Sequence, residues 1–190
     1  MTAQRVLDIS AMAFLDAIDI RFLIETCEAG NQPAAVAVVN ATKTVKVVEC
    51  IYRSLWTRLV IIVARAYTKN FRPGDLNVGY AFELLKDPSI RADVESKGNP
   101  AAMIEAVALW SKCRGDHRLS SFLAFRDKEI AHRSELDFNI PRPIINDILA
   151  ISRNTATLFE RLAQGAGAVT LSLDSQLINY PEEARRFWEH

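Results

Sequence analysis

The most constraining feature of this sequence is the spacing of its apolar residues, which recur every three or four positions through several long segments. The clearest segment has apolar residues at Val48, Ile51, Tyr52, Leu55, Leu59, Ile62, Val63 and Ala66. Side chains with this spacing share one face of an α-helix. Many of them are β-branched, but the spacing continues without a turn signal, so it favours helix over strand. The pattern predicts an all-α fold.

The same spacing predicts long helices over residues 10–29, 100–112 and 142–164, with Ser10 as the first N-cap. Residues 33–69 form either one long helix or two helices broken near residues 40–44, where Asn and Thr lower helix propensity. Shorter helices are expected at residues 80–86, 89–96 and 181–190. We expect Phe187 and Trp188 of the last one to dock on the body or on a second subunit.

The length of 190 residues predicts one domain, residues 1–190. Turn-forming residues divide this domain further. They predict an irregular insertion at about residues 70–99 and a C-terminal extension at about residues 168–190. Residues 59–64, the most apolar run, lie between two arginines and are far shorter than the roughly 20 residues that cross a bilayer. We therefore expect no membrane association and, without an export signal, a cytoplasmic protein.

Cysteine and charge patterns limit the kinds of site. Cys27, Cys50 and Cys113 have no C-x-x-C spacing or histidine neighbours, so we expect buried thiols and no metal site. No cofactor-binding motif is present, so no cofactor is expected. The 23 basic and 23 acidic residues give zero net charge, so any site for a polyanion must be local.

One run of basic residues extends over residues 51–74 without an acid: Arg53, Arg58, Arg65, Lys69 and Arg72. It is either a solvated helix face or a stripe that follows phosphates.

A second feature, the sequence FRDKEIAHR at residues 125–133, places Arg126, Asp127 and His132 in one helical, partly apolar segment. On an ideal helix Arg126 and His132 are about 120° apart around the axis and about 9 Å apart along it. They would flank a common groove, and a helix kink or a two-fold dimer axis could bring the pair or its copies together.

These residue types suit cleavage of a phosphodiester. A histidine with a near-neutral pKa can move the proton of a ribose 2′-hydroxyl or of the leaving oxygen, and a guanidinium can stabilise charge on the phosphate. Asp127 could orient a catalytic side chain, and this scheme needs no metal. Lys128, Arg133 and Arg118 are the candidate substrate-binding residues, because bases outnumber acids around the motif. The alternative is structural: Arg and acids on one helix commonly form ion pairs, and a lone helical His is often a packing residue.

The arginine, the polar residue after it and the histidine after five intervening residues resemble the R-x(4–6)-H motif of the HEPN superfamily. The longer string is most similar to its AbiU-type abortive-infection branch, which has an F-R-(N/D)-K-x-x-A-H pattern late in an all-helical domain. By this resemblance Arg126 and His132 would be catalytic and Asp127 accessory.

The resemblance implies an up-and-down bundle of long antiparallel helices with short extra helices, often a homodimer with motif residues of both subunits facing one cleft. It implies a metal-independent endoribonuclease of phage defence or a toxin–antitoxin system, with RNA as substrate and an antitoxin or other regulatory protein as partner. The alternative is a non-catalytic helical dimer that binds RNA or protein.

Overall fold

The computed structural model describes residues 3–68, 74–127 and 143–189, and within these ranges the chain is all-α, without a β-strand. The helices are α1 (Ala3–Gly30), α2 (Pro33–Thr42), α3 (Val45–Ala66), α4 (Val78–Leu84), α5 (Pro88–Lys97), α6 (Pro100–Arg114), α7 (Arg118–Phe125), α8 (Ile145–Gly165), α9 (Leu173–Gln176) and α10 (Tyr180–Glu189). The predicted fold class is confirmed at this level. Among the described residues no helix is long and apolar enough to cross a bilayer.

Helix α1 is longer than the sequence predicted. Its buried face begins at Val6 and Ile9 and continues with three-and-four spacing to Cys27. Ser10 is therefore not an N-cap: it lies inside the helix, fully buried, and its hydroxyl donates to the carbonyl of Val6 at 2.6 Å. The prediction was wrong because the apolar stripe extends to Val6, about one turn before Ser10, and the polar residues Gln4 and Arg5 obscure its start.

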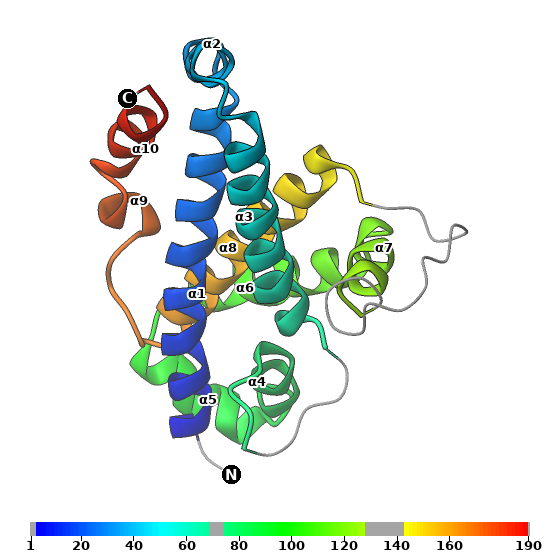
Figure 1. Ribbon diagram of the computed structural model, residues 1–190. Helices are drawn as coiled ribbons and strands as arrows, with labels where there is room; N and C mark the ends of the chain where they lie inside the picture. Colours follow the sequence, from blue (N-terminus) through cyan, green and yellow to red (C-terminus); the bar gives the residue numbers. More distant parts are fainter. Residues whose placement is uncertain (1–2, 69–73, 128–142, 190) are drawn as a thin grey trace.

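The segment after α1 is two helices rather than one. Lys43 adopts a left-handed conformation (φ 56°) that ends α2, and α3 begins at Val45. The break lies where Asn and Thr lowered helix propensity. After it, α3 returns antiparallel to α1, while α2 caps the far end of the pair (Figure 1).

The core forms where α8 packs against α1 and α6. Phe159 and Leu162 of α8 are almost completely buried there, within one contiguous apolar cluster that draws on α1 and α3–α8. Gly165 permits a close approach of α8 to α6, because a Cβ at this position would lie 2.7 Å from backbone atoms of Met103. Figure 1 shows α8 passing obliquely behind α1, so these two helices are not aligned.

The short helices begin at polar caps. The side chains of Asn77, Asp87 and Asn99 accept hydrogen bonds from backbone N–H groups at the starts of α4, α5 and α6. Such caps satisfy donors that a helix start otherwise leaves unpaired. Helices α4 and α5 correspond to the two short helices predicted after residue 79.

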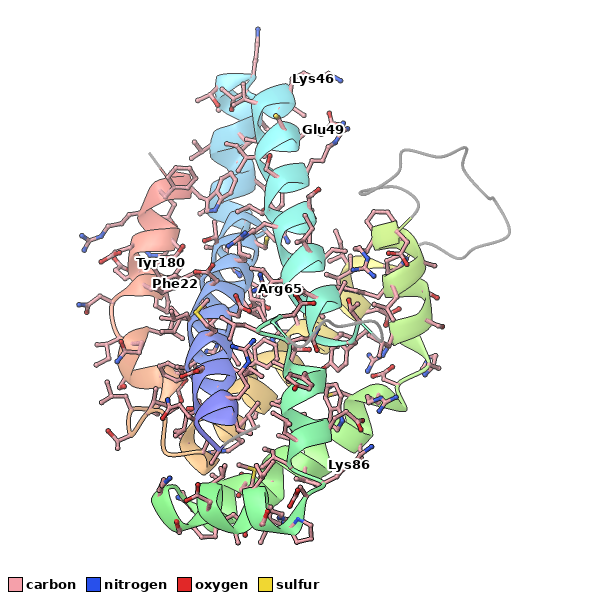
Figure 2. The ribbon with its side chains drawn as sticks, turned by 90° about the horizontal axis from the view of Figure 1, so that it is seen from below. Phe22, Lys46, Glu49, Arg65, Lys86 and Tyr180 are labelled. Atoms are coloured by element: carbon pink, nitrogen blue, oxygen red, sulfur yellow. The ribbon has the colours of Figure 1, made fainter. Side chains whose placement is uncertain are left out.

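The C-terminal extension packs along α1. Trp188 is buried and its indole N–H donates to the carbonyl of Thr26 at 2.8 Å. The rings of Tyr180 and Phe22 stack with centroids 4.1 Å apart (Figure 2). The docking predicted for Trp188 is confirmed, whereas Phe187 is 62% exposed and does not pack into the core.

The cysteines differ from the prediction at one position. Cys27 and Cys113 are buried, and burial raises the pKa of the Cys27 thiol to about 12. Cys50 is exposed on α3, because it lies on the face of that helix away from α1. In the described ranges no three His, Cys, Asp or Glu side chains are grouped as metal ligands would be.

Candidate functional site

Helix α7 carries the first part of the Arg126–His132 motif. It starts where the Asp116 carboxylate accepts a hydrogen bond from the backbone N–H of Arg118, at 2.9 Å. Leu119 and Phe122 bury the inner face of the helix. Arg126 follows Phe122 by four residues and therefore continues that inner face. This spacing explains why the arginine lies against the body of the protein, with its side chain only 25% exposed.

The structure brings Arg126 and Asp127 together. The Arg126 Nε and the Asp127 carboxylate form a short ion pair, and Asp127 is the more exposed partner at 56%. The contact does not have hydrogen-bonding geometry: within the described ranges the buried Nε has no hydrogen-bond acceptor. The two residues form a wide, π-type turn at the end of α7, a feature that is frequent at functional sites.

Thr68, at the end of α3, is the other contact of Arg126. Its hydroxyl accepts from Arg126 Nη1 at 3.4 Å, which is long for a hydrogen bond to a charged donor. The guanidinium thus keeps donors that its described neighbours do not fully satisfy. The remaining guanidinium donors of Arg126 can therefore bind a phosphate while the ion pair with Asp127 stays in place.

Thr68 also lines a cavity of about 330 Å³. The remaining lining residues are Met12, Arg65, Asp75, Leu76 and Asn77. Asn77 is engaged in the fold, because its side chain caps α4 and donates to the Arg65 carbonyl at 2.9 Å. Thr68 therefore connects the Arg126 guanidinium to a small pocket with mixed polarity.

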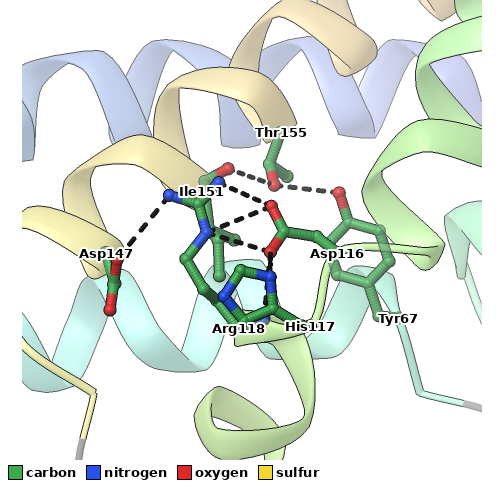
Figure 3. Close-up of polar contacts among 7 residues, drawn as sticks. All are labelled: Tyr67, Asp116, His117, Arg118, Asp147, Ile151 and Thr155. Atoms are coloured by element: carbon green, nitrogen blue, oxygen red, sulfur yellow. Dashed lines mark hydrogen bonds and ion pairs between the residues drawn. The ribbon is translucent and has the colours of Figure 1, made fainter.

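The other predicted site residues fall in two groups. His132, Lys128 and Arg133 lie outside the described residues. Arg118 lies at the opposite end of α7 from Arg126, where its guanidinium contacts both oxygens of Asp116, with Nη2 to Oδ2 at 2.6 Å. Its Nη1 is also 3.6 Å from Asp147 of α8 (Figure 3).

The Asp116–Arg118 pair has a clear electrostatic signature. Hydrogen bonding from Arg118 is the largest cause that lowers the pKa of the Asp116 carboxyl. The side chain of His117 is 93% exposed, so it is a surface residue. It makes no side-chain cap contact.

Tyr67 joins three helices beside this pair. Its hydroxyl lies 3.0 Å from the Thr155 hydroxyl, which in turn donates to the Ile151 carbonyl of α8 (Figure 3). Its ring stacks on Trp110 of α6 with centroids 5.5 Å apart. Burial raises the pKa of Tyr67 well above its usual range, so the hydroxyl stays protonated.

The basic run on α3 is engaged in ion pairs where it is described. Arg58 pairs with Asp19 at 3.0 Å and Arg65 with Asp16 at 2.5 Å, both on α1. Arg53 lies 3.4 Å from Glu49. Lys69 and Arg72 lie outside the described residues. For the three described arginines, these pairs favour the solvated-face interpretation over a phosphate stripe.

Sequence reasoning did not identify Thr68 as a neighbour of the motif. The two residues are 58 positions apart, and a threonine at a helix end has no chemical signature of its own. It also missed a groove between α4, α5 and α6, because the groove is built from three helices that each look ordinary in sequence.

Comparisons with models of protein families, with curated proteins and with solved structures give no match.

Proposed function

We propose that this protein is a metal-independent endoribonuclease of a defence or toxin-type system, in which Arg126 and His132 cleave RNA with help from Asp127. One observation carries the proposal: Arg126 lies at the end of α7 in a π-type turn, paired with Asp127, while its buried Nε has no hydrogen-bond acceptor among the described residues. A guanidinium that is positioned but incompletely satisfied is suited to bind a phosphate.

The chemistry follows from the residue types. Neutral His132 takes the proton of a ribose 2′-hydroxyl, and the resulting oxygen attacks the adjacent phosphorus. The bond from phosphorus to the 5′-oxygen breaks, and that oxygen takes the proton back from the His132 imidazolium as it leaves, which restores the neutral histidine. Arg126 stabilises the negative charge that builds on the phosphate, and Asp127 holds the guanidinium in position. The products are a 2′,3′-cyclic phosphate and a 5′-hydroxyl.

The proposal includes a homodimer acting in the cytoplasm, with an up-and-down helical bundle as its fold and an antitoxin or other regulatory protein as a partner. The antiparallel pair α1 and α3 supports the bundle (Figure 1). The dimer is supported by the spacing of the motif, because Arg126 and His132 are about a third of a turn apart on an ideal helix. A second copy could complete a site that one chain leaves open.

The test is cleavage of structured and unstructured RNAs by the purified full chain in EDTA. We expect wild-type protein to cleave, and Arg126→Ala and His132→Ala proteins to lose cleavage while their circular dichroism and melting curves remain close to wild type. Arg58→Ala is the matched control, because it removes an equal charge from an exposed ion pair. Intact RNA after incubation with wild-type dimer would reject the proposal.

A second candidate is a non-catalytic helical module that binds RNA or protein. It is favoured by the contacts that Arg126 makes to Asp127 and Thr68, which tie the end of α7 to the end of α3. In that case Arg126→Ala and His132→Ala lower the melting temperature and no cleavage is detected in any variant. Lost cleavage with an unchanged melting curve rejects this candidate.

A further inference from the structure

A groove of about 850 Å³ lies between α4, α5 and α6, away from the residues that carry the proposed cleavage. Its apolar wall consists of Phe82, Leu85, Val107 and Trp110. The rings of Phe82 and Trp110 stack with centroids 4.6 Å apart, which holds the wall rigid. The volume falls within the range of roughly 300–1,000 Å³ that is usual for sites of small ligands.

Basic side chains predominate among the charged residues of this groove. Lys86, Arg91 and Arg114 line it, against one acid, Glu83. Lys86 pairs with that acid at 2.6 Å and extends from the outer surface of the molecule (Figure 2). Arg91 pairs through its Nε with Glu95 at 2.8 Å. The groove therefore has an excess of positive charge in a protein whose net charge is zero.

Arg114 is the most available of these cations. Its guanidinium carbon lies 5.5 Å from the centroid of the Trp110 ring, and the residue is exposed. Within the described part of the chain no carboxylate lies within ion-pair distance of it. The Trp110 indole holds the Arg114 guanidinium in place by a cation–π contact, while the N–H groups at the edge of the guanidinium remain available to an anion.

We propose that this groove binds a nucleotide, with the base against the apolar wall and the phosphate on Arg114 and Arg91. A nucleotide has both a flat base, which matches the apolar wall of the groove, and a negative phosphate, which matches its basic side chains. Arginine matches phosphate in a bidentate manner, and its plane can also stack on a base. An acidic peptide would match the charge, but it would not use the planar guanidinium and the aromatic wall together.

The position of the groove favours a nucleotide of single-stranded RNA over a free nucleotide. Tyr67 stacks on Trp110 of the groove, and the next residue, Thr68, contacts Arg126. Both places therefore adjoin the end of α3, and we expect one RNA strand to span them. This choice of RNA rests on the proposed function, whereas binding of a nucleotide by the groove does not.

The test measures binding of a fluorescent ten-residue poly(A) carrying 2′-O-methyl groups, which has no attacking hydroxyl and cannot be cleaved. We expect Arg114→Ala to weaken binding about tenfold, because a charge-assisted contact to phosphate is lost. The slope of log affinity against log salt should fall by about 0.7. Lys112→Ala is the matched control, since Lys112 is an exposed cation on α6 that does not line the groove; we expect less than a twofold change.

Ser111→Trp supplies a second variant that changes no charge. Ser111 is exposed and lines the groove, so a tryptophan there should obstruct part of the groove and weaken binding while the melting curve stays near wild type. Equal weakening by Arg114→Ala and Lys112→Ala, or full binding by Ser111→Trp, would overturn the proposal. Displacement of the RNA by an oligoglutamate peptide as readily as by unlabelled RNA would also overturn it.

Two further arms separate the possible sources of the nucleotide and the two proposals. Binding of AMP that depends on Arg114, without binding of the RNA, supports the nucleotide site and rejects RNA as its source. An Arg126→Ala protein should lose cleavage, while its RNA binding should still be weakened by Arg114→Ala. If wild-type protein binds RNA in the groove but cleaves no RNA, the nucleotide site is supported and only the proposed nuclease function is rejected.

Discussion

Two arginines at opposite ends of α7 have different surroundings. Arg118 contacts both oxygens of Asp116, and Asp147 lies nearby on α8. Arg126 pairs with its chain neighbour Asp127 and reaches Thr68 at 3.4 Å, and its Nε has no hydrogen-bond acceptor in the described ranges. Among the residues that the structure describes, carboxylates saturate the Arg118 guanidinium, whereas the Arg126 guanidinium keeps a nitrogen without an acceptor.

The difference supports a structural role for Arg118 and is consistent with the functional role proposed for Arg126. Arg118 could bind substrate, as predicted, only by leaving Asp116, whose side chain is 15% exposed and would lose its counter-charge. Arg126 needs no such exchange. The two arginines, eight positions apart, therefore differ in the acids beside them and in what other segments add, Asp147 to Arg118 and Thr68 to Arg126.

The largest expected effect is the loss of RNA cleavage when Arg126 is replaced. Arg126→Lys keeps the charge but loses the fork-shaped donor, so we expect RNA cleavage to fall about 10²-fold or more. Arg118→Lys, the matched change, should leave the cleavage rate per folded molecule within about threefold, because a saturated arginine contributes no transition-state contact. Single-turnover cleavage of one RNA measures both. Equal losses in the two variants would contradict the assignment of roles.

The next effect concerns stability. Arg118→Ala should lower the free energy of unfolding by about 1–2 kcal/mol, because it leaves the poorly exposed Asp116 carboxylate unpaired. For a chain of this size the melting temperature should fall by about 2–8 °C. Arg126→Ala should change stability by less, since Asp127 is chiefly exposed. Urea unfolding of both variants checks the order, and a reversed order would show that Arg126 is the structural residue.

A smaller effect is the pH dependence of the Asp116–Arg118 pair. The pKa of Asp116 is lower in the folded state, so the pair's contribution is present above the unfolded pKa, about 3.9, and is lost as pH falls through the lower folded value. The stability difference between wild type and Asp116→Asn should therefore narrow as pH falls below about 4.

The control for this pH effect removes its cause. In an Arg118→Ala background, Asp116→Asn should show little of this pH dependence, because the arginine is the main source of the shift. Unfolding in urea at several pH values measures the four proteins as one cycle. A stability difference that widens towards acid pH would contradict the lowered pKa.

The smallest expected effect is the change in stability when an ion-paired arginine of α3 is replaced. Arg58→Ala should change the free energy of unfolding by less than about 0.5 kcal/mol, since its ion pair with Asp19 is exposed. Binding of RNA should change by less than about twofold if this face is solvated and does not follow phosphates. A loss of affinity comparable to that of Arg114→Ala would restore the phosphate-stripe interpretation.

Several local features followed from nearby residues. Apolar spacing predicted the long helices, and low helix propensity near residues 40–44 marked the break that the structure shows at Lys43. The prediction at Ser10 failed because a hydroxyl can cap a helix or bond inside it, and only the extent of the helix decides between them. For the candidate site, sequence indicated Arg126 and Asp127 as chemistry-bearing neighbours but not their contact with Thr68.

The local sequence thus decided which residues are helical, because helix formation depends on a few adjacent residues. It also decided which reactive side chains lie near one another along a helix, because these are i, i+4 neighbours. Packing between distant segments decided the rest. The end of α3 meets the end of α7 at Arg126, α8 supplies Asp147 to Arg118, and α4–α6 enclose the groove around Trp110. These contacts join residues that are far apart in sequence, so only the packing of the helices could place Thr68 beside Arg126 and Asp147 beside Arg118. The main partner of Arg118, Asp116, is by contrast a near neighbour in sequence.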